Sequence, residues 1–255
     1  MKTKILKNNK TLTIHPATKA YDHQNFIHSS EGRVIRLLAE YLYPKQQLEK
    51  QRIKRCIIFF GSARSKPSEE NTNKITAQYY RDSQKLANLI ASWSNSLPID
   101  KQFHICTGGG PGIMEAANKG ASETGAKSVG LNISLPFEQN PNQYIANELN
   151  FEFHYFFMRK FWFVYLASAM AVFPGGFGTM DELLEILTLR QTQKVTKPLP
   201  IFLYSEEYWK KLINFDFMIE MGMIAKEDLN LFTFVNSPEE AFEKMKTALS
   251  EIHKI

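Results

Sequence analysis

The sequence has little of several features that would mark whole classes of protein. Its 255 residues include only two cysteines, Cys56 and Cys106, which lie in or beside apolar runs without the spacing of metal ligands. We therefore expect two buried free thiols in a reducing cytoplasm, and neither a disulfide framework nor a metal centre. The net charge of +5 is small for this length, and no dense block of Lys and Arg is present. Nucleic acid is therefore not an expected partner.

Long uncharged hydrophobic runs are also absent. The most apolar stretch, residues 153–173, is long enough to suggest a membrane span, but it carries Arg159 and Lys160 near its middle. These charges, and the Pro-Gly-Gly that closes the stretch, favour a buried helix that runs into a buried strand. The basic N-terminal residues 1–16 have no apolar segment typical of a secretory signal. We therefore expect no membrane partner and a cytoplasmic location.

From about residue 55 onward, short apolar runs alternate with stretches of helical periodicity. Strands are predicted at residues 56–62, 103–110, 127–136, 168–176 and 197–204. Helices are predicted between them, and one of these begins at Pro111. This alternation favours an α/β fold, a Rossmann-like doubly wound parallel sheet with helices on both faces. Ligands bind beyond the carboxyl ends of the strands in such sheets.

Further helices are predicted at both ends of the chain. Apolar residues at positions 34, 35, 37, 38, 41 and 42 predict an amphipathic helix that Pro44 ends. We take residues 1–50 as an N-terminal helical extension, which packs on the main domain or on a partner subunit, and residues 51–255 as the Rossmann-like domain. Two helices are predicted at 206–222 and 237–252, the second of which begins with an N-capping serine and a proline.

Glycine is concentrated at three predicted strand ends, most of all in PGGFGT at residues 174–179. A glycine turn between a strand and a helix lets the backbone approach an anion, which the N–H groups and dipole of the helix then hold. The turn is not a Walker A loop, because the Gly-Lys-Ser/Thr ending is absent. GGGPGIME at 108–115 also lacks the dinucleotide-binding spacing. PGGFGT therefore predicts a phosphate site for a smaller ligand; the alternative is that its glycines only turn the chain tightly.

Two charged side chains near this turn have more than one interpretation. Thr179 and Glu182 have the spacing of a capping box, in which Glu182 would bond back to the Thr179 backbone, so Glu182 is either a cap or a functional carboxylate. Arg159 lies among aromatic residues, where an unpaired guanidinium is costly. It therefore requires a structural salt bridge with a buried carboxylate or a bound anion.

Taken together, these motifs resemble the LONELY GUY family. The segments that carry the resemblance, in the family's order, are GGGPGIMEAANKGA (108–121), the Arg159-Lys160 pair, PGGFGTMDE (174–182), LTLRQ (187–191) and KP (197–198). The likeness covers about residues 55–245. Members are cytokinin riboside 5′-monophosphate phosphoribohydrolases, often misnamed lysine decarboxylases. The resemblance implies hydrolysis of the N-glycosidic bond of a nucleoside 5′-monophosphate, without metal or organic cofactor, by a homodimer or higher homo-oligomer.

The resemblance also implies roles for individual residues. The family's catalytic arginine and glutamate fall on Arg159 and Glu182, and the substrate would be AMP or a cytokinin riboside monophosphate. Residues expected at the substrate are Gly61, Ser62, Gly109, Gly110, Glu138, Lys160, Gly175, Gly176, Gly178, Thr179, Asp181 and Thr188. A rival interpretation is a nucleotide-binding sensor or carrier without turnover. A pure binder, however, needs the glycine loop but not the Arg159 and Glu182 pair.

Overall fold

The computed structural model describes residues 5–7, 10–12, 17–67, 73–136 and 140–255, and the chain divides into two compact units, residues 1–42 and 43–255. In the first unit two short strands pair antiparallel, and a 3-10 turn precedes a short helix. These elements are β1 (Ile5–Lys7), β2 (Lys10–Leu12), the turn Ala20–Asp22 and α1 (Gln24–Ile27). Helix α2 (Arg33–Lys50) follows, and the boundary between the units falls within its residues.

A sheet of seven parallel strands forms the centre of the second unit. Its order is β6-β5-β4-β3-β7-β8-β9. The strands are β3 (Cys56–Phe60), β4 (His104–Thr107), β5 (Ser128–Ile133), β6 (Asn150–Phe153), β7 (Ala167–Val172), β8 (Ile201–Tyr204) and β9 (Thr233–Val235). The chain builds outward from β3 to β6 and then returns to the other side of β3 with β7. The predicted doubly wound sheet is confirmed, and its order reverses between β3 and β7, where ligands bind in such folds.

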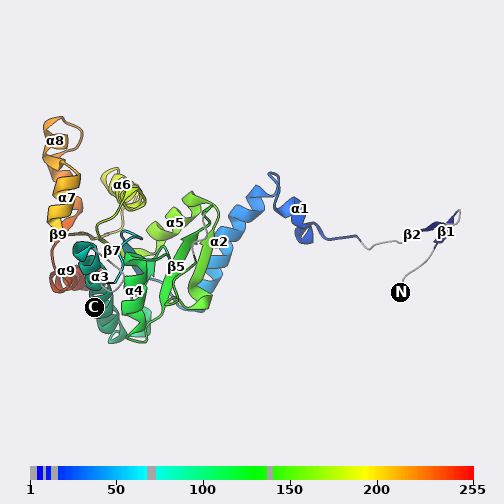
Figure 1. The fold of residues 1–255 in the computed structure, drawn as a ribbon, viewed down its shortest axis with the longest axis horizontal. Helices are drawn as coiled ribbons and strands as arrows, with labels where there is room; N and C mark the ends of the chain where they lie inside the picture. The colour runs from blue at the N-terminus through cyan, green and yellow to red at the C-terminus, as the bar shows by residue number, and fades with distance from the viewer. Residues whose placement is uncertain (1–4, 8–9, 13–16, 68–72, 137–139) are drawn as a thin grey trace. The chain divides into compact units, whose positions relative to one another are not determined.

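Helices cover both faces of this sheet. They are α3 (Lys74–Asn95), α4 (Ile113–Ser122), α5 (Phe156–Leu166), α6 (Phe177–Gln191), α7 (Glu206–Leu212), α8 (Phe215–Glu220) and α9 (Pro238–His253), with 3-10 turns at Ile99–Lys101, Asn147–Leu149 and Lys226–Leu231. Helix α3 packs against both α4 and α9 on one face (Figure 1). Helix α5 contacts β3, β5 and β6 from the other face.

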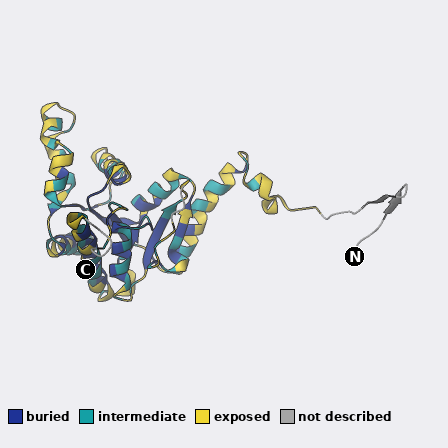
Figure 2. Ribbon diagram, viewed as in Figure 1, coloured by how far each residue is buried: buried dark blue, intermediate teal, exposed yellow. Residues whose placement is uncertain are grey.

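Strand β3 shows how the two faces are filled. All five of its residues are buried, and successive side chains of a strand point to opposite faces. Ile57 and Phe59 belong to the core shared with α3, α4 and α9. The ring of Phe60 packs instead against Phe163 of α5, with ring centroids 4.9 Å apart. Figure 2 shows the strands in dark blue, between helices whose outer surfaces are yellow.

Several sequence predictions are confirmed in this unit. The five predicted strands are present, and the stretch 153–173 contains helix α5, which passes directly into strand β7. Cys56 and Cys106 are buried free thiols. Among the described residues, no helix has the length and apolar character needed to cross a membrane. The edge strands β6 and β9 were not predicted, because they are short and contain no long continuous run of apolar residues.

Some helix boundaries differ from those predicted. Pro44 does not end α2 but lies buried inside it, because one missing N–H donor leaves the hydrogen bonds of the other turns in place. Helix α4 begins at Ile113 rather than at Pro111, because Gly112 between them has a φ of 75°, outside the helical region.

The predicted helix 206–222 is also interrupted. It is two helices, α7 and α8, and Asn214 between them caps α8 by accepting a hydrogen bond from the N–H of Phe217 at 3.0 Å. The predicted cap of α9 is confirmed, since the Ser237 hydroxyl accepts from the N–H of Glu240 at 3.2 Å.

Gly120 allows α3 and α4 to approach each other closely. A Cβ at this position would collide with the carbonyl oxygen of Gln84 on α3. We expect Gly120→Ala to lower the free energy of unfolding by about 1–3 kcal/mol, because the two helices must move apart. Urea denaturation would measure this, with Lys119→Ala at the preceding position as the control. A Gly120→Ala variant as stable as Lys119→Ala would contradict the close approach.

Candidate functional site

A cavity of about 940 Å³ opens at the carboxyl ends of the central strands. Its size falls within the range of small-molecule pockets, about 300–1,000 Å³. It is lined by Phe60 at the end of β3, residues 61–65 after β3, residues 174–180 after β7, and Arg159 and Phe163 of α5. The cavity therefore lies at the reversal of strand order between β3 and β7.

The two loops at this reversal are bonded to each other. The N–H of Ser62 donates to the carbonyl oxygen of Pro174 at 3.1 Å. Gly175 follows in a buried position, where a Cβ would collide with the hydroxyl of Thr179. Gly176 is the N-cap of α6 and is exposed. Because N–H groups in the first turn of a helix have no acceptor within the helix, α6 presents donors and its positive dipole end at the cavity.

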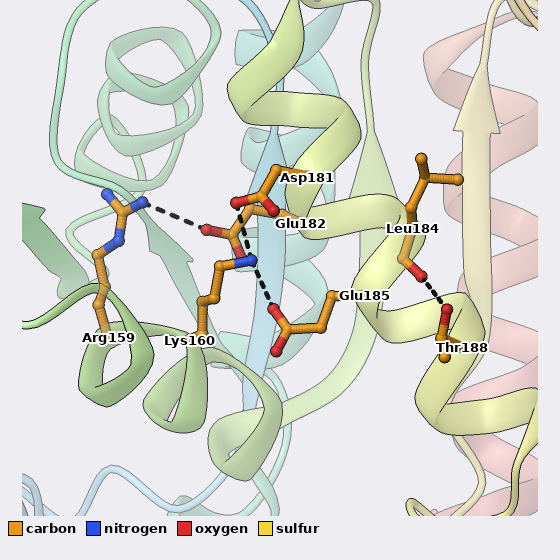
Figure 3. Close-up of polar contacts among 7 residues, drawn as sticks. All are labelled: Arg159, Lys160, Asp181, Glu182, Leu184, Glu185 and Thr188. Carbon is orange, nitrogen blue, oxygen red and sulfur yellow. Dashed lines mark hydrogen bonds and ion pairs between the residues drawn. The ribbon is translucent and has the colours of Figure 1, made fainter.

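Thr179 lies inside α6 and not at its start. The helix begins at Phe177, and its N-cap is Gly176, which has no side chain that could cap the helix. The capping-box interpretation of Thr179 and Glu182 is therefore wrong, because the helix starts two residues before Thr179. Glu182 instead faces helix α5 (Figure 3).

Arg159 and Glu182 form a buried ion pair between α5 and α6 (Figure 3). Nη2 of Arg159 lies 3.2 Å from Oε1 of Glu182, and the two side chains are 13% and 8% exposed. The guanidinium also lies over the rings of Phe156 and Phe163, at 5.2 and 5.7 Å from their centroids. Its Nε is buried and has no hydrogen-bond partner among the residues that the structure describes. Such a donor is costly to bury. Because Arg159 also lines the cavity, its positive charge favours an anionic ligand there.

Burial shifts both members of this pair toward their neutral forms. It raises the pKa of Glu182, and the charges of Arg159 and Lys160 oppose that rise. It lowers the pKa of Arg159, against the attraction of Glu182 and Asp181. An arginine nevertheless stays charged in proteins, so the pair presents a fixed cation beside a carboxylate that water solvates poorly.

Lys160 occupies a second ion-pair cluster next to the first. Its Nζ lies 2.8 Å from Oδ2 of Asp181 and 2.7 Å from Oε2 of Glu185, and its side chain is 15% exposed (Figure 3). Within the described part of the chain, the cavity lining includes neither Lys160 nor Asp181. Two cations of α5 are thus matched by three acids of α6.

The cavity brings together eight of the predicted site residues. They are Gly61, Ser62, Arg159, Gly175, Gly176, Gly178, Thr179 and Glu182. Thr188 lies elsewhere on α6, where it is exposed and its hydroxyl donates to the carbonyl oxygen of Leu184 at 2.8 Å (Figure 3). Glu138 lies outside the described residues.

Gly109 and Gly110 lie in the loop after β4 and are not among the described residues that line the cavity. The side-chain amide of Asn142 donates to their carbonyl oxygens at 3.0 and 3.1 Å. Gly109 has a φ of 73°, which suits glycine, and a Cβ there would collide with Asn132. Their neighbour Gly108 lines the cavity instead.

Helices α3 and α7 add cavity residues that no local motif marks. These are Asn73, Ile75, Thr76 and Tyr79 at the start of α3, and Glu207, Tyr208, Lys211 and Leu212 on α7. They reach the cavity because the ends of β3 and β8 lie on the same edge of the sheet. The helical periodicity of their segments did not predict that they line the cavity.

Lys197, from the KP pair, supports the site from outside the cavity. Its Nζ donates to the carbonyl oxygens of Val164 and Tyr165 at 2.7 and 3.0 Å. Burial lowers the pKa of Lys197 to about 8. The lysine thereby satisfies carbonyl groups at the end of α5, the helix that carries Arg159.

Comparison with known proteins places these features in a family. The sequence model of the family described as "Possible lysine decarboxylase" matches residues 114–245, just over half of the chain. An Arabidopsis thaliana protein named cytokinin riboside 5′-monophosphate phosphoribohydrolase is 23% identical over 208 residues, which cover 79% of this chain and 86% of the relative.

Two other relatives share shorter regions. A protein of Oryza sativa named as a probable cytokinin riboside 5′-monophosphate phosphoribohydrolase is 28% identical over 59% of this chain and 65% of its own length. The pyrimidine/purine nucleotide 5′-monophosphate nucleosidase of Escherichia coli is 32% identical over 45% of this chain and 28% of its own length. The chain therefore spans less than two thirds of the length of these two relatives.

Solved structures share the fold. The molybdenum cofactor carrier protein of Chlamydomonas reinhardtii has a TM-score of 0.53 at 18% identity, covering 78% of this chain and 99% of its own. The molybdenum cofactor binding protein of Rippkaea orientalis has a TM-score of 0.50 at 19% identity, covering 76% and 96%. These similarities support the Rossmann-like fold alone. The match at residues 114–245, which includes the Arg159-Lys160 pair and the PGGFGTMDE segment, shows that the chain belongs to the family described as "Possible lysine decarboxylase", the LONELY GUY family that its motifs resemble.

Proposed function

We propose that this protein hydrolyses the N-glycosidic bond of a nucleoside 5′-monophosphate, releasing the free base and ribose 5-phosphate. The observation that carries the proposal is the buried pair of Arg159 and Glu182, which shares one cavity with the glycine loop of α6. The names of the Arabidopsis and E. coli relatives, a phosphoribohydrolase and a nucleosidase, support the same reaction. AMP and cytokinin riboside monophosphates are the proposed substrates, and water is the second reactant.

In this proposal the 5′-phosphate binds at the start of α6. The exposed loop there, with Gly176 and Gly178, leaves open space where side chains would otherwise stand. Backbone N–H groups and the helix dipole supply the positive potential that a phosphate requires. Binding energy from this remote group then positions the glycosidic bond beside Glu182.

Glu182 acts on the developing charge of the sugar. Cleavage of a C–N bond to ribose passes through an oxocarbenium-like state, which a nearby carboxylate stabilises. Because Glu182 is buried, water screens that attraction weakly. Arg159 holds the carboxylate in place, and its positive charge at the cavity is proposed to attract an anionic oxygen of the substrate.

The rival function, a nucleotide sensor or carrier, is less well supported. Binding alone requires the glycine loop, but it gains nothing from a buried carboxylate whose desolvation must be offset by a buried arginine. The two buried free thiols fit a reducing compartment, and we propose the cytoplasm.

Hydrolysis can be tested directly with AMP, other nucleoside monophosphates and isopentenyladenosine monophosphate. We expect release of free base and ribose 5-phosphate, which chromatography and mass spectrometry would detect. Glu182→Gln should lower kcat by about 100-fold or more, because the amide cannot stabilise positive charge on the ribose. Adenosine should be a far poorer substrate than AMP.

The matched control is Glu251→Gln, an exposed acid near the end of α9, which should leave turnover unchanged. Equal turnover of adenosine and AMP would contradict the phosphate site. Binding of nucleotides without release of any base would favour the sensor.

Lys160 should tune the pH dependence of this reaction. The ionised form of Glu182 is required, so the rate falls as the pH drops through its pKa, which burial raises. Lys160 opposes that rise, and Lys160→Met should therefore raise the pKa further and move the acidic limb of kcat to higher pH. The profile of kcat against pH would measure the shift, with Lys244→Met of α9 as a control for loss of one positive charge.

An acidic limb at the same pH in wild type and Lys160→Met would contradict the electrostatic role. An increase in KM alone would indicate that Lys160 contacts the substrate, as the family resemblance implies.

We also propose a homodimer or larger homo-oligomer, in which a second copy covers the aromatic face of α5. Phe156, Phe157, Phe161 and Tyr165 on this helix are 41–59% exposed, and Leu184 of α6 is 44% exposed. Clustered large apolar side chains are typical of interaction surfaces. Light scattering should give at least twice the mass of one chain, and Phe161→Glu should lower it toward that of a monomer. A wild-type monomer would contradict the proposal.

A further inference from the structure

Tyr208 of α7 contacts the proposed phosphate loop through its hydroxyl group. Its Oη donates to the carbonyl oxygen of Gly175 at 2.7 Å. The direction of this bond is fixed by chemistry, since a carbonyl oxygen can only accept. Tyr208 also lines the cavity. Its bond joins α7 to a loop that is far away in the sequence.

This bond is one of two that hold consecutive carbonyl groups of the loop. The other runs from the N–H of Ser62, after β3, to the carbonyl oxygen of Pro174 at 3.1 Å. Two successive peptide groups of the loop are therefore held by donors from different elements. The loop after β3 holds Pro174–Gly175, and helix α7, which follows β8, holds Gly175–Gly176. Side-chain packing does not hold Gly176 or Gly178, because both are glycines and a Cβ at either position would meet nothing within 4 Å.

The bond to Gly175 also constrains the next N–H group. The C=O of Gly175 and the N–H of Gly176 belong to one planar trans peptide, in which they point in opposite directions. When the carbonyl is held toward Tyr208, the N–H of Gly176 is held away from it. Without this restraint a glycine peptide at the N-cap has access to many orientations.

Helix α7 provides a firm support for this tyrosine. Trp209 beside it is fully buried, and its Nε1 donates to the carbonyl oxygen of Tyr204 at 3.0 Å. The rings of Tyr208 and Trp209 pack edge to face with centroids 5.2 Å apart. The N–H of Ser205 donates to Val235 of the neighbouring strand at 2.8 Å, which ties the start of α7 to the sheet.

We infer that Tyr208 is a positioning residue that orients the Gly175–Gly176 peptide, so that the N–H of Gly176 is aimed at the phosphate of the ligand. The inference rests on the proposed function, because that function places a phosphate at the start of α6. Burial raises the pKa of Tyr208, which keeps the phenol protonated and able to donate at neutral pH.

Tyr208→Phe tests this, because it removes only the hydroxyl and keeps the ring beside Trp209. Calorimetric titration should show binding of ribose 5-phosphate and of inorganic phosphate weakened about three- to ten-fold, the usual effect of losing one hydrogen bond. The affinity for adenosine, which has no phosphate, and the Tm should match those of the wild type. Tyr43→Phe, at an exposed tyrosine of α2, serves as the control.

Two results of the binding experiment would overturn the inference. One is an unchanged affinity of Tyr208→Phe for ribose 5-phosphate; the other is an equal loss for ribose 5-phosphate and adenosine, which would indicate general disturbance of the cavity. Failure of the inference about Tyr208 can be distinguished from failure of the proposed hydrolysis. Ribose 5-phosphate binding that depends on Tyr208, without base release from any nucleotide, would support Tyr208 and overturn hydrolysis. Turnover with the same KM for AMP in both proteins would overturn Tyr208 alone.

Discussion

The parallel pairing of β3 with β7 is the constraint on which the rest of the site depends. Its register places Phe59 beside Ala171 and Phe60 beside Val172, so both strands end at the same edge of the sheet. The loops that follow them meet there, and the Ser62 N–H reaches the Pro174 carbonyl. Because both strands are buried on both faces, a shift of one residue in register would move their side chains into the opposite layer and disrupt the packing there.

The charges of α5 impose a second constraint, this time on α6. Arg159 and Lys160 lie in an otherwise apolar helix, and each needs a partner when it is buried. Asp181, Glu182 and Glu185 supply those partners from one side of α6. A buried ion pair contributes little net stability, because desolvation offsets the attraction, and apolar side chains of similar size would serve as well. The presence of a buried carboxylate and guanidinium at a cavity is therefore better explained by their effect on a ligand than by a contribution to folding.

The sequence predicted what depends on local pattern and missed what depends on contacts between distant segments. Continuous apolar runs identified the five central strands and hence the fold, but the short edge strand β9 has no such run. The spacing of Thr179 and Glu182 fitted a capping box equally well, because nothing local shows that α6 starts at Phe177. The place of Tyr208 at the cavity requires the whole sheet, since β8 must stand beside β7 before α7 can reach the glycine loop.

A glycine-rich binding loop must satisfy two opposing requirements: it needs glycine to leave space for a ligand, and it needs a backbone that is already ordered. The segment at Gly175 and Gly176 needs glycine, because a side chain at the first position would collide with Thr179 and one at the second would occupy the space proposed for a phosphate. Glycine, however, adds conformational freedom, and a loop that must be ordered by its ligand binds that ligand more weakly. Hydrogen bonds to the two carbonyl groups resolve the conflict, since they restrain the backbone from the side opposite its N–H groups. In this fold the restraint comes from segments that follow the neighbouring strands β3 and β8. The loop after β3 and helix α7 are therefore parts of the site, although neither carries its charged pair.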